Sequence, residues 1–171
     1  VPSALIESHP IPGIDPVNCT AQRGVWGPWA ERLPHFRMGF TPSSGDEIQS
    51  EYHLPRAHAA AAIAALRGLR EAVAPVLLIS EIRTVRGDDL WLSPHYGRDS
   101  VSFHFTWGPD QAAVEVAVAA VEAALAPYDP RPHWGKLFLP RAPSEPQWAA
   151  SYPRLADFLA LGEREPVLDR G

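Results

Sequence analysis

Four polar side chains occur at alternate positions in two short runs that have the composition of β-strands. Glu81 and Arg83 lie in the first run, and His104 and Thr106 lie in the second. Because side chains two residues apart in a strand project from the same face, each pair shares a face. If the two strands are neighbours, a carboxylate, a guanidinium, an imidazole and a hydroxyl form one polar patch. Such directional donors and acceptors suit a ligand with several hydroxyl groups.

A fifth candidate, Lys136, ends the segment PRPHWGK (130–136). Two prolines and a tryptophan stiffen the approach to this lysine. The apolar residues LFL (137–139) follow at once and would limit how far the ammonium reaches into water. A lysine held near a ligand hydroxyl can polarise it and stabilise developing alkoxide charge. Lys136 is therefore a candidate catalytic group.

Each of these residues also has a plain structural explanation. Glu81 and Arg83 could form a solvated salt bridge, which contributes under about 1 kcal/mol. A single histidine such as His104 can be a surface or hydrogen-bonded strand residue, and threonine is a good strand former. An exposed lysine is common. Only the joint pattern favours a ligand site over these alternatives.

Motifs for other chemistries are absent from the sequence. It contains no glycine-rich phosphate loop, no G-x-S-x-G and no cysteine-pair metal motif. His104, His133 and Glu81 are conceivable metal ligands, but they do not have a recognised ligand spacing, so we expect no metal. The single cysteine, Cys19, shows no local sign of activation.

Composition limits the remaining classes. A chain of 171 residues with 46% hydrophobic residues suits one domain, alone or with an irregular extension. The formal net charge of −5 argues against a nucleic-acid partner. No apolar run approaches the roughly 20 residues that cross a bilayer, so we expect no membrane span. The amino end does not resemble a signal peptide, and one cysteine fits a reducing compartment, which predicts a cytoplasmic location.

Proline marks the irregular parts of the chain. The 19 prolines cluster at residues 2–42 and 127–153, so the regular elements are expected between these stretches. We interpret residues 1–48 as an irregular, Pro-rich extension that covers a surface outside this chain, and residues 49–171 as the domain.

The hydrophobic pattern predicts the elements of that domain. The cleanest signal is SVSFHFTW (100–107), in which apolar and polar residues alternate strictly. The expected elements, in order, are a strand at 48–54, a helix at 57–74, a strand at 76–85, a strand at 100–107, a helix at 110–126 with Asp110 as its N-cap, a loop through PRPHWGK into a short strand, and a helix at 147–161 interrupted at Tyr152-Pro153. This order predicts an α+β fold, an antiparallel sheet with helices packed on one face in a split βαβ arrangement.

Several motifs, in this order and at this spacing, resemble the carboxyl-terminal part of the bacterial alditol oxidases, also called xylitol oxidases. These enzymes belong to the sugar-lactone oxidase branch of the vanillyl-alcohol-oxidase flavoproteins. The motifs are GPWAERLPHFR (27–37), FTPSSGDEIQSEYHLPR (40–56), APVLLISEIRTV (74–85), WLSPHYGRDSVSFHFTW (91–107) and RPHWGKLF (131–138). The likeness extends from about residue 20 to about residue 161.

The resemblance implies a function and a set of site residues. In that family an amino-terminal domain carries FAD, and a carboxyl-terminal cap holds a polyol such as xylitol or sorbitol, whose terminal hydroxyl is oxidised to the aldose while O₂ becomes H₂O₂. The implied polyol-binding residues are Glu81, Arg83, His104, Thr106 and Lys136. Arg83 and Lys136 are the implied catalytic residues, nearest the reacting hydroxyl and the flavin.

The chain also departs from the family pattern. The 171 residues contain no counterpart of the FAD-binding domain, so the flavin-binding domain of the same enzyme is the implied partner and the chain alone is expected to be inactive. The end GEREPVLDRG (162–171) differs from the Asp-Pro…Gly-Lys-Phe segment of relatives. Two alternatives stay open, a fragment of an aldonolactone oxidase (D-arabinono-1,4-lactone type) and a stand-alone polyol-binding module without catalysis.

Overall fold

The computed structural model describes residues 6–11, 13–32, 36–40, 46–139 and 151–164. The chain divides into two compact units, Val1–Glu47 and Ile48–Gly171. The described part of the first unit is irregular, with two short 3₁₀ helices, η1 (Pro16–Asn18) and η2 (Trp29–Glu31), and an isolated bridge between Cys19 and Phe36. The role expected for this extension, packing on a flavin domain, stays a prediction.

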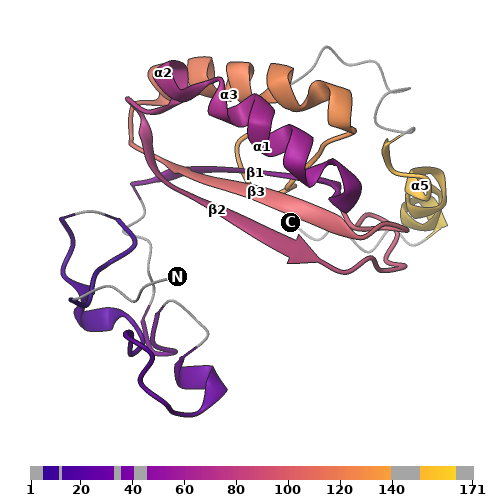
Figure 1. Cartoon of the computed structure of the whole chain (residues 1–171). Helices are drawn as coiled ribbons and strands as arrows, with labels where there is room; N and C mark the ends of the chain where they lie inside the picture. The colour runs from indigo at the N-terminus through magenta and orange to yellow at the C-terminus, as the bar shows by residue number, and fades with distance from the viewer. Residues whose placement is uncertain (1–5, 12, 33–35, 41–45, 140–150, 165–171) are drawn as a thin grey trace, which may run out of the picture. The chain divides into compact units, whose positions relative to one another are not determined.

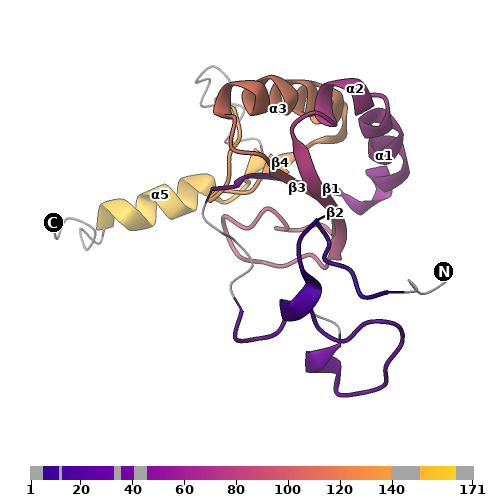
Figure 2. The ribbon, with the colours of Figure 1, turned by 90° about the vertical axis from the view of Figure 1, so that its left-hand side faces the viewer.

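The second unit is built on an antiparallel sheet. Its strands are β1 (Ile48–Pro55), β2 (Leu77–Val85), β3 (Ser100–Trp107) and β4 (Arg131–Pro132), in the spatial order β2-β3-β1-β4. Helices α1 (Ala59–Arg67), α2 (Arg70–Val73) and α3 (Gln111–Leu125) all lie on one face of this sheet (Figures 1 and 2). The predicted α+β fold with its split βαβ arrangement is confirmed.

The helix predicted at 57–74 is two helices. The chain forms η3 (Arg56–His58), α1 (Ala59–Arg67) and α2 (Arg70–Val73), with a break at Gly68. The backbone N–H of Gly68 donates to the carbonyl of Ala65 at 3.1 Å, which tightens the last turn of α1. Only proline has a lower helix propensity than glycine, so α1 ends at Gly68 although the surrounding alanines favour a continuous helix.

The other long helix, α3 (Gln111–Leu125), begins as predicted. The Asp110 side chain accepts a hydrogen bond from the backbone N–H of Ala113 at 3.1 Å and caps the helix. The short helix η4 (Ala126–Tyr128) follows, with Pro127 inside it. Among the described residues, Gln111–Tyr128 is the one helical stretch whose length and apolar composition would allow a membrane span.

The core lies between the sheet and these helices. All eight residues of β3 are buried, but only Val101, Phe103, Phe105 and Trp107 belong to the hydrophobic core, which confirms the face expected from their alternation. They belong to one hydrophobic cluster with fully buried residues of α3, namely Val114, Ala117, Val118, Val121 and Leu125. The apolar composition of α3 is thus accounted for by its place in this core. The indole of Trp107 donates to Ser50 Oγ at 2.9 Å, so its one polar atom is satisfied.

The segment around Lys136 differs from its prediction. The short strand precedes the loop instead of following it, because β4 pairs with β1 through Tyr52–Pro132 and His53–Arg131. The chain then turns, with the N–H of Lys136 bonded to the carbonyl of His133 at 3.2 Å. The last helix, α5 (Leu155–Arg164), begins after Tyr152-Pro153, and the expected start at Gln147 lies outside the described residues.

Candidate functional site

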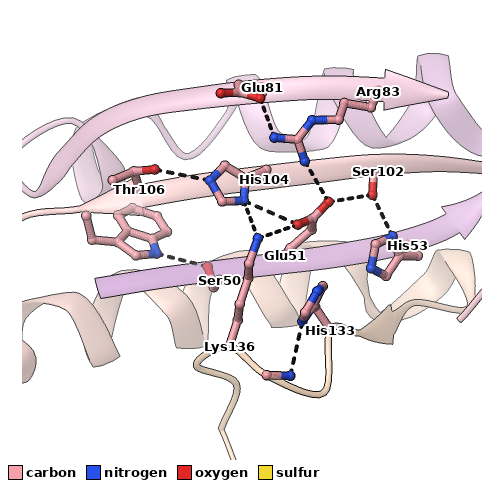
Figure 3. Close-up of polar contacts among 12 residues, drawn as sticks. Ser50, Glu51, His53, Glu81, Arg83, Ser102, His104, Thr106, His133 and Lys136 are labelled. Atoms are coloured by element: carbon pink, nitrogen blue, oxygen red, sulfur yellow. Dashed lines mark hydrogen bonds and ion pairs between the residues drawn. The ribbon is translucent and has the colours of Figure 1, made fainter. Parts of the chain in front are cut away.

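The strand register brings the polar side chains of three strands into one row. Glu81 of β2 lies opposite His104 of β3, and His104 lies opposite Glu51 of β1 on its other side. In the same way Arg83 and Ser102 are paired. The expectation that the two polar pairs are neighbours is confirmed. All these side chains lie on the sheet face opposite the core, and we call this surface the polar face (Figure 3).

Lys136 joins the polar face from the loop after β4. Its ammonium nitrogen lies 2.6 Å from Glu51 Oε2 and 2.9 Å from His104 Nδ1. Only 18% of its side chain is exposed, as the apolar residues behind it led us to expect. All five predicted side chains therefore lie together, and their role in binding a ligand stays a prediction.

The loop that carries Lys136 is tied down on both sides of the lysine. The indole of Trp134 donates to the carbonyl of Leu92 at 3.0 Å, and the N–H of Gly135 donates to His133 Nδ1 at 3.1 Å. Beyond the lysine, the N–H of Leu137 donates to the carbonyl of Gln49 on β1 at 2.8 Å. These bonds restrict the backbone from which the flexible lysine side chain extends.

Glu51 is the centre of the polar face, and the sequence analysis did not identify it as a site residue. Its side chain is buried, and both of its oxygens are occupied. Oε1 accepts from Ser102 Oγ at 2.8 Å and from Arg83 Nη1 at 3.1 Å. Oε2 accepts from Lys136, with His104 Nδ1 at 3.3 Å. The signal that could have found it is the polar alternation Gln49, Glu51, His53 in β1.

Arg83 connects the two carboxylates. One terminal nitrogen donates to Glu51, and the other forms a short ion pair with Glu81 Oε2. The Arg83 side chain is 45% exposed and that of Glu81 is 26% exposed, so both remain open to a ligand. Two carboxylates and two cations balance on this face, which leaves no net charge among the four groups.

The surroundings set the protonation of Glu51. Burial acts to raise the pKa of this carboxyl, but hydrogen bonds with His104, Lys136 and Ser102 outweigh it and hold the pKa well below its usual range. The direct charge of Lys136 acts in the same direction. Glu51 is therefore ionised at neutral pH and can only accept hydrogen bonds.

His53 extends this network toward the end of β1. Ser102 Oγ has one proton, which it donates to Glu51, so it accepts from His53 Nδ1 at 2.5 Å. Burial lowers the pKa of His53 to about 4, with His95, His133 and Lys136 acting in the same direction against Glu51. The His53 ring is therefore neutral at pH 7, with its proton on Nδ1.

His104 is held between two partners. Its Nε2 lies 3.1 Å from Thr106 Oγ1, and its Nδ1 faces the Lys136 ammonium. The side chains of His104 and Thr106 are buried. Among the residues that the structure describes, no three His, Cys, Asp or Glu side chains are arranged to hold a metal ion. The polar face thus offers hydroxyl, imidazole, carboxylate and cationic groups in a fixed arrangement.

The chain is similar in sequence to known oxidases over most of its length. The chain is 56% identical over 158 residues to the alditol oxidase of Streptomyces sp. (strain IKD472 / FERM P-14339), an alignment that covers 92% of this chain and 37% of that enzyme. The chain therefore spans about a third of the length of this curated relative. A family profile described as D-arabinono-1,4-lactone oxidase matches residues 44–165, which contain the whole polar face. The chain belongs to the D-arabinono-1,4-lactone oxidase family.

Proposed function

We propose that this chain is the substrate-binding part of an FAD-dependent oxidase that acts on alditols such as xylitol and sorbitol. The observation that carries the proposal is the convergence of Glu81, Arg83, His104, Thr106 and Lys136 on one face of the sheet. The 56% identity to an alditol oxidase supports a polyol as the substrate class. In the reaction, the terminal CH₂OH group loses a hydride and a proton to become an aldehyde, and O₂ gains the two electrons and two protons to become H₂O₂.

The side chains divide the work of binding between them. Glu81 and Arg83, which are the more exposed pair, would accept from and donate to hydroxyls along the polyol. Thr106 and His104 lie deeper and would fix one end of the chain. A ligand lacking one hydroxyl would leave a buried polar group without its partner, which is how such a site discriminates.

Lys136 and Arg83 would act on the reacting hydroxyl. An ammonium and a guanidinium both donate hydrogen bonds to an oxygen that gains negative charge, and they favour the alkoxide over the alcohol. Lys136 is bonded to the ionised Glu51, so we assign it the part of a charged donor rather than that of a base.

The charge of the polar face suits a neutral polyol better than the negatively charged diphosphate of FAD. Its two cations are balanced by the carboxylates with which they pair, Arg83 with Glu81 and Lys136 with Glu51, so the face has no surplus of positive charge for a diphosphate. We therefore propose that FAD is held mainly by a flavin-binding domain outside this chain. When bound, FAD accepts the two electrons from the substrate and passes them to O₂.

A chimera tests the proposed function. In it, this chain replaces the matching segment of the Streptomyces alditol oxidase, and the parent enzyme is the control. We expect the purified chimera to be yellow and to consume O₂ and form H₂O₂ when xylitol is added. A folded, flavin-loaded chimera that none of the alditols reduces would overturn the proposal.

The family profile supports a second candidate substrate, an aldonolactone. The same chimera distinguishes the two substrate classes. If D-arabinono-1,4-lactone reduces its flavin and xylitol does not, the lactone is favoured. A polyol-binding module without catalysis is distinguished by calorimetry, because it predicts that the isolated chain binds xylitol while the chimera shows no turnover.

Thr106 provides a prediction about binding within the chimera. We expect Thr106→Ala to lower kcat/KM for xylitol by the equivalent of about 1–3 kcal/mol, because His104 and a substrate hydroxyl each lose a buried partner. The matched control is Thr84→Ala, an exposed threonine of β2. Steady-state O₂ consumption measures both variants. An unchanged kcat/KM for Thr106→Ala would make this threonine purely structural.

A further inference from the structure

Glu51 differs from the other carboxylate of the polar face in how its oxygens are used. Its side chain is 6% exposed, and its two oxygens meet Arg83, Ser102, His104 and Lys136. Glu81 is 26% exposed and pairs with Arg83 through Oε2. A ligand hydroxyl can therefore reach Glu81, while Glu51 has no comparable capacity left for a ligand.

The partners of Glu51 come from three different parts of the fold. Arg83 extends from β2, Ser102 and His104 stand on β3, and Lys136 comes from the loop after β4. Figure 3 shows the Glu51 carboxylate between the ends of the arginine and lysine side chains. One carboxylate on β1 thus ties the two cations to fixed places on the sheet.

The chain contains a single lysine, and it is Lys136; the other 14 basic residues counted with it are arginines, since lysine and arginine together number 15. A lysine side chain has a flexible four-carbon stem, so an unrestrained ammonium would sample many positions. A tightly paired, largely buried ammonium samples few. Holding the donor in place before the substrate arrives avoids reorganisation during the reaction.

We propose that Glu51 is a positioning residue that holds the Lys136 ammonium and the Arg83 guanidinium, one on each of its oxygens, in fixed places for the reacting hydroxyl. It acts through these two groups and does not touch the substrate itself. This inference deepens the proposed function and rests on it for the identity of the substrate, but the contact between Glu51 and Lys136 can be tested without any substrate.

The first test uses the isolated chain and its single lysine. Lysine labelled with ¹⁵N at Nζ gives one side-chain ammonium signal, which is assigned by its loss in Lys136→Met. In the wild-type chain we expect this signal to be sharp, because a largely buried ammonium that donates to Glu51 exchanges its protons slowly. Glu51→Gln should broaden this signal beyond detection. Glu51→Asp should give a weaker or shifted signal, since the carboxylate is present but its side chain is one methylene shorter.

The matched control is Glu81→Gln. Glu81 bonds Arg83 and not Lys136, so the lysine signal should keep its position and width in this variant. If circular dichroism shows that Glu51→Gln does not fold, Glu51→Asp serves as the test by itself, and we expect it to change the chemical shift of the lysine ammonium signal. A lysine signal that is the same in wild type, Glu51→Gln and Glu51→Asp overturns the proposal.

The second test is kinetic and uses the chimera. We expect Glu51→Gln to slow flavin reduction by xylitol about 100-fold, the usual cost of a misplaced catalytic group, with a larger effect on kcat than on KM. Glu51→Asp should recover part of the rate. Reduction by Glu51→Gln at the wild-type rate overturns the positioning role. If polyols do not reduce the flavin of the unmutated chimera, the result counts against the proposed function. The NMR result then still tests whether Glu51 holds Lys136.

Discussion

Lys136→Met in the chimera should lower the rate of flavin reduction by xylitol about a thousand-fold, which is the loss expected when a preorganised donor to a developing oxyanion is removed. Methionine has nearly the length of lysine and removes only the charge and the donor hydrogens. The Lys136 side chain lies outside the hydrophobic core, so the variant should keep its fold. Stopped-flow absorbance of the flavin under anaerobic conditions measures the step directly.

Arg67→Met is the matched control for this variant. It removes one positive charge from the exposed surface of α1, which belongs to the helix layer on one face of the sheet. We expect xylitol to reduce the flavin of this variant at nearly the unmutated rate, because an exposed charge that pairs with no group of the polar face is screened by solvent and salt. Near-normal reduction by Lys136→Met would remove this lysine from the mechanism, while equal loss in both variants would point to a general effect of charge.

The elements of the sheet were predictable because their signals are local. Strict alternation in Ser100–Trp107 identifies both a strand and the face that packs in the hydrophobic core, and the structure places Phe103 and Trp107 in that core as expected. Asp110 likewise identifies a helix start from its own side chain. The break at Gly68 was missed since the surrounding alanines continue the helical pattern through it.

The candidate site was only partly predictable because it depends on which strands are neighbours. Glu81 and His104 lie on strands that follow one another in the chain, so a hairpin was a natural inference. Glu51 lies on β1, which pairs with β3 only after the chain has passed through α1, α2 and β2. No local pattern specifies that pairing, since register between distant strands is set by the packed core. The alternation of Gln49, Glu51 and His53 marks a polar side of β1, but only the pairing of β1 with β3 shows that Glu51 lies at the centre of the polar face.

His53 makes the stability of the chain depend on pH in a defined window. Its ring is buried, and the pKa of about 4 in the folded chain lies below the value of 6.5 for a free imidazole. The unfolded chain therefore binds a proton first as the pH falls. The contribution of the neutral ring to stability is complete above about pH 6.5 and is lost between about pH 6.5 and pH 4. The Glu51 carboxyl, whose pKa is lowered from 4.5, begins to lose its contribution near pH 4.5, at the acidic end of this window, and loses the rest at lower pH.

From these directions we expect the free energy of unfolding to fall by about 2 kcal/mol between about pH 7 and pH 4.5 on account of His53. Urea unfolding at each pH measures it. His53→Gln should flatten the dependence, whereas His58→Gln, which changes an exposed imidazole of η3, should keep the wild-type fall. His95, whose pKa burial also lowers, adds a residual dependence of the same sign. A His53→Gln variant with the full wild-type dependence would mean that the proton is taken up elsewhere in the chain.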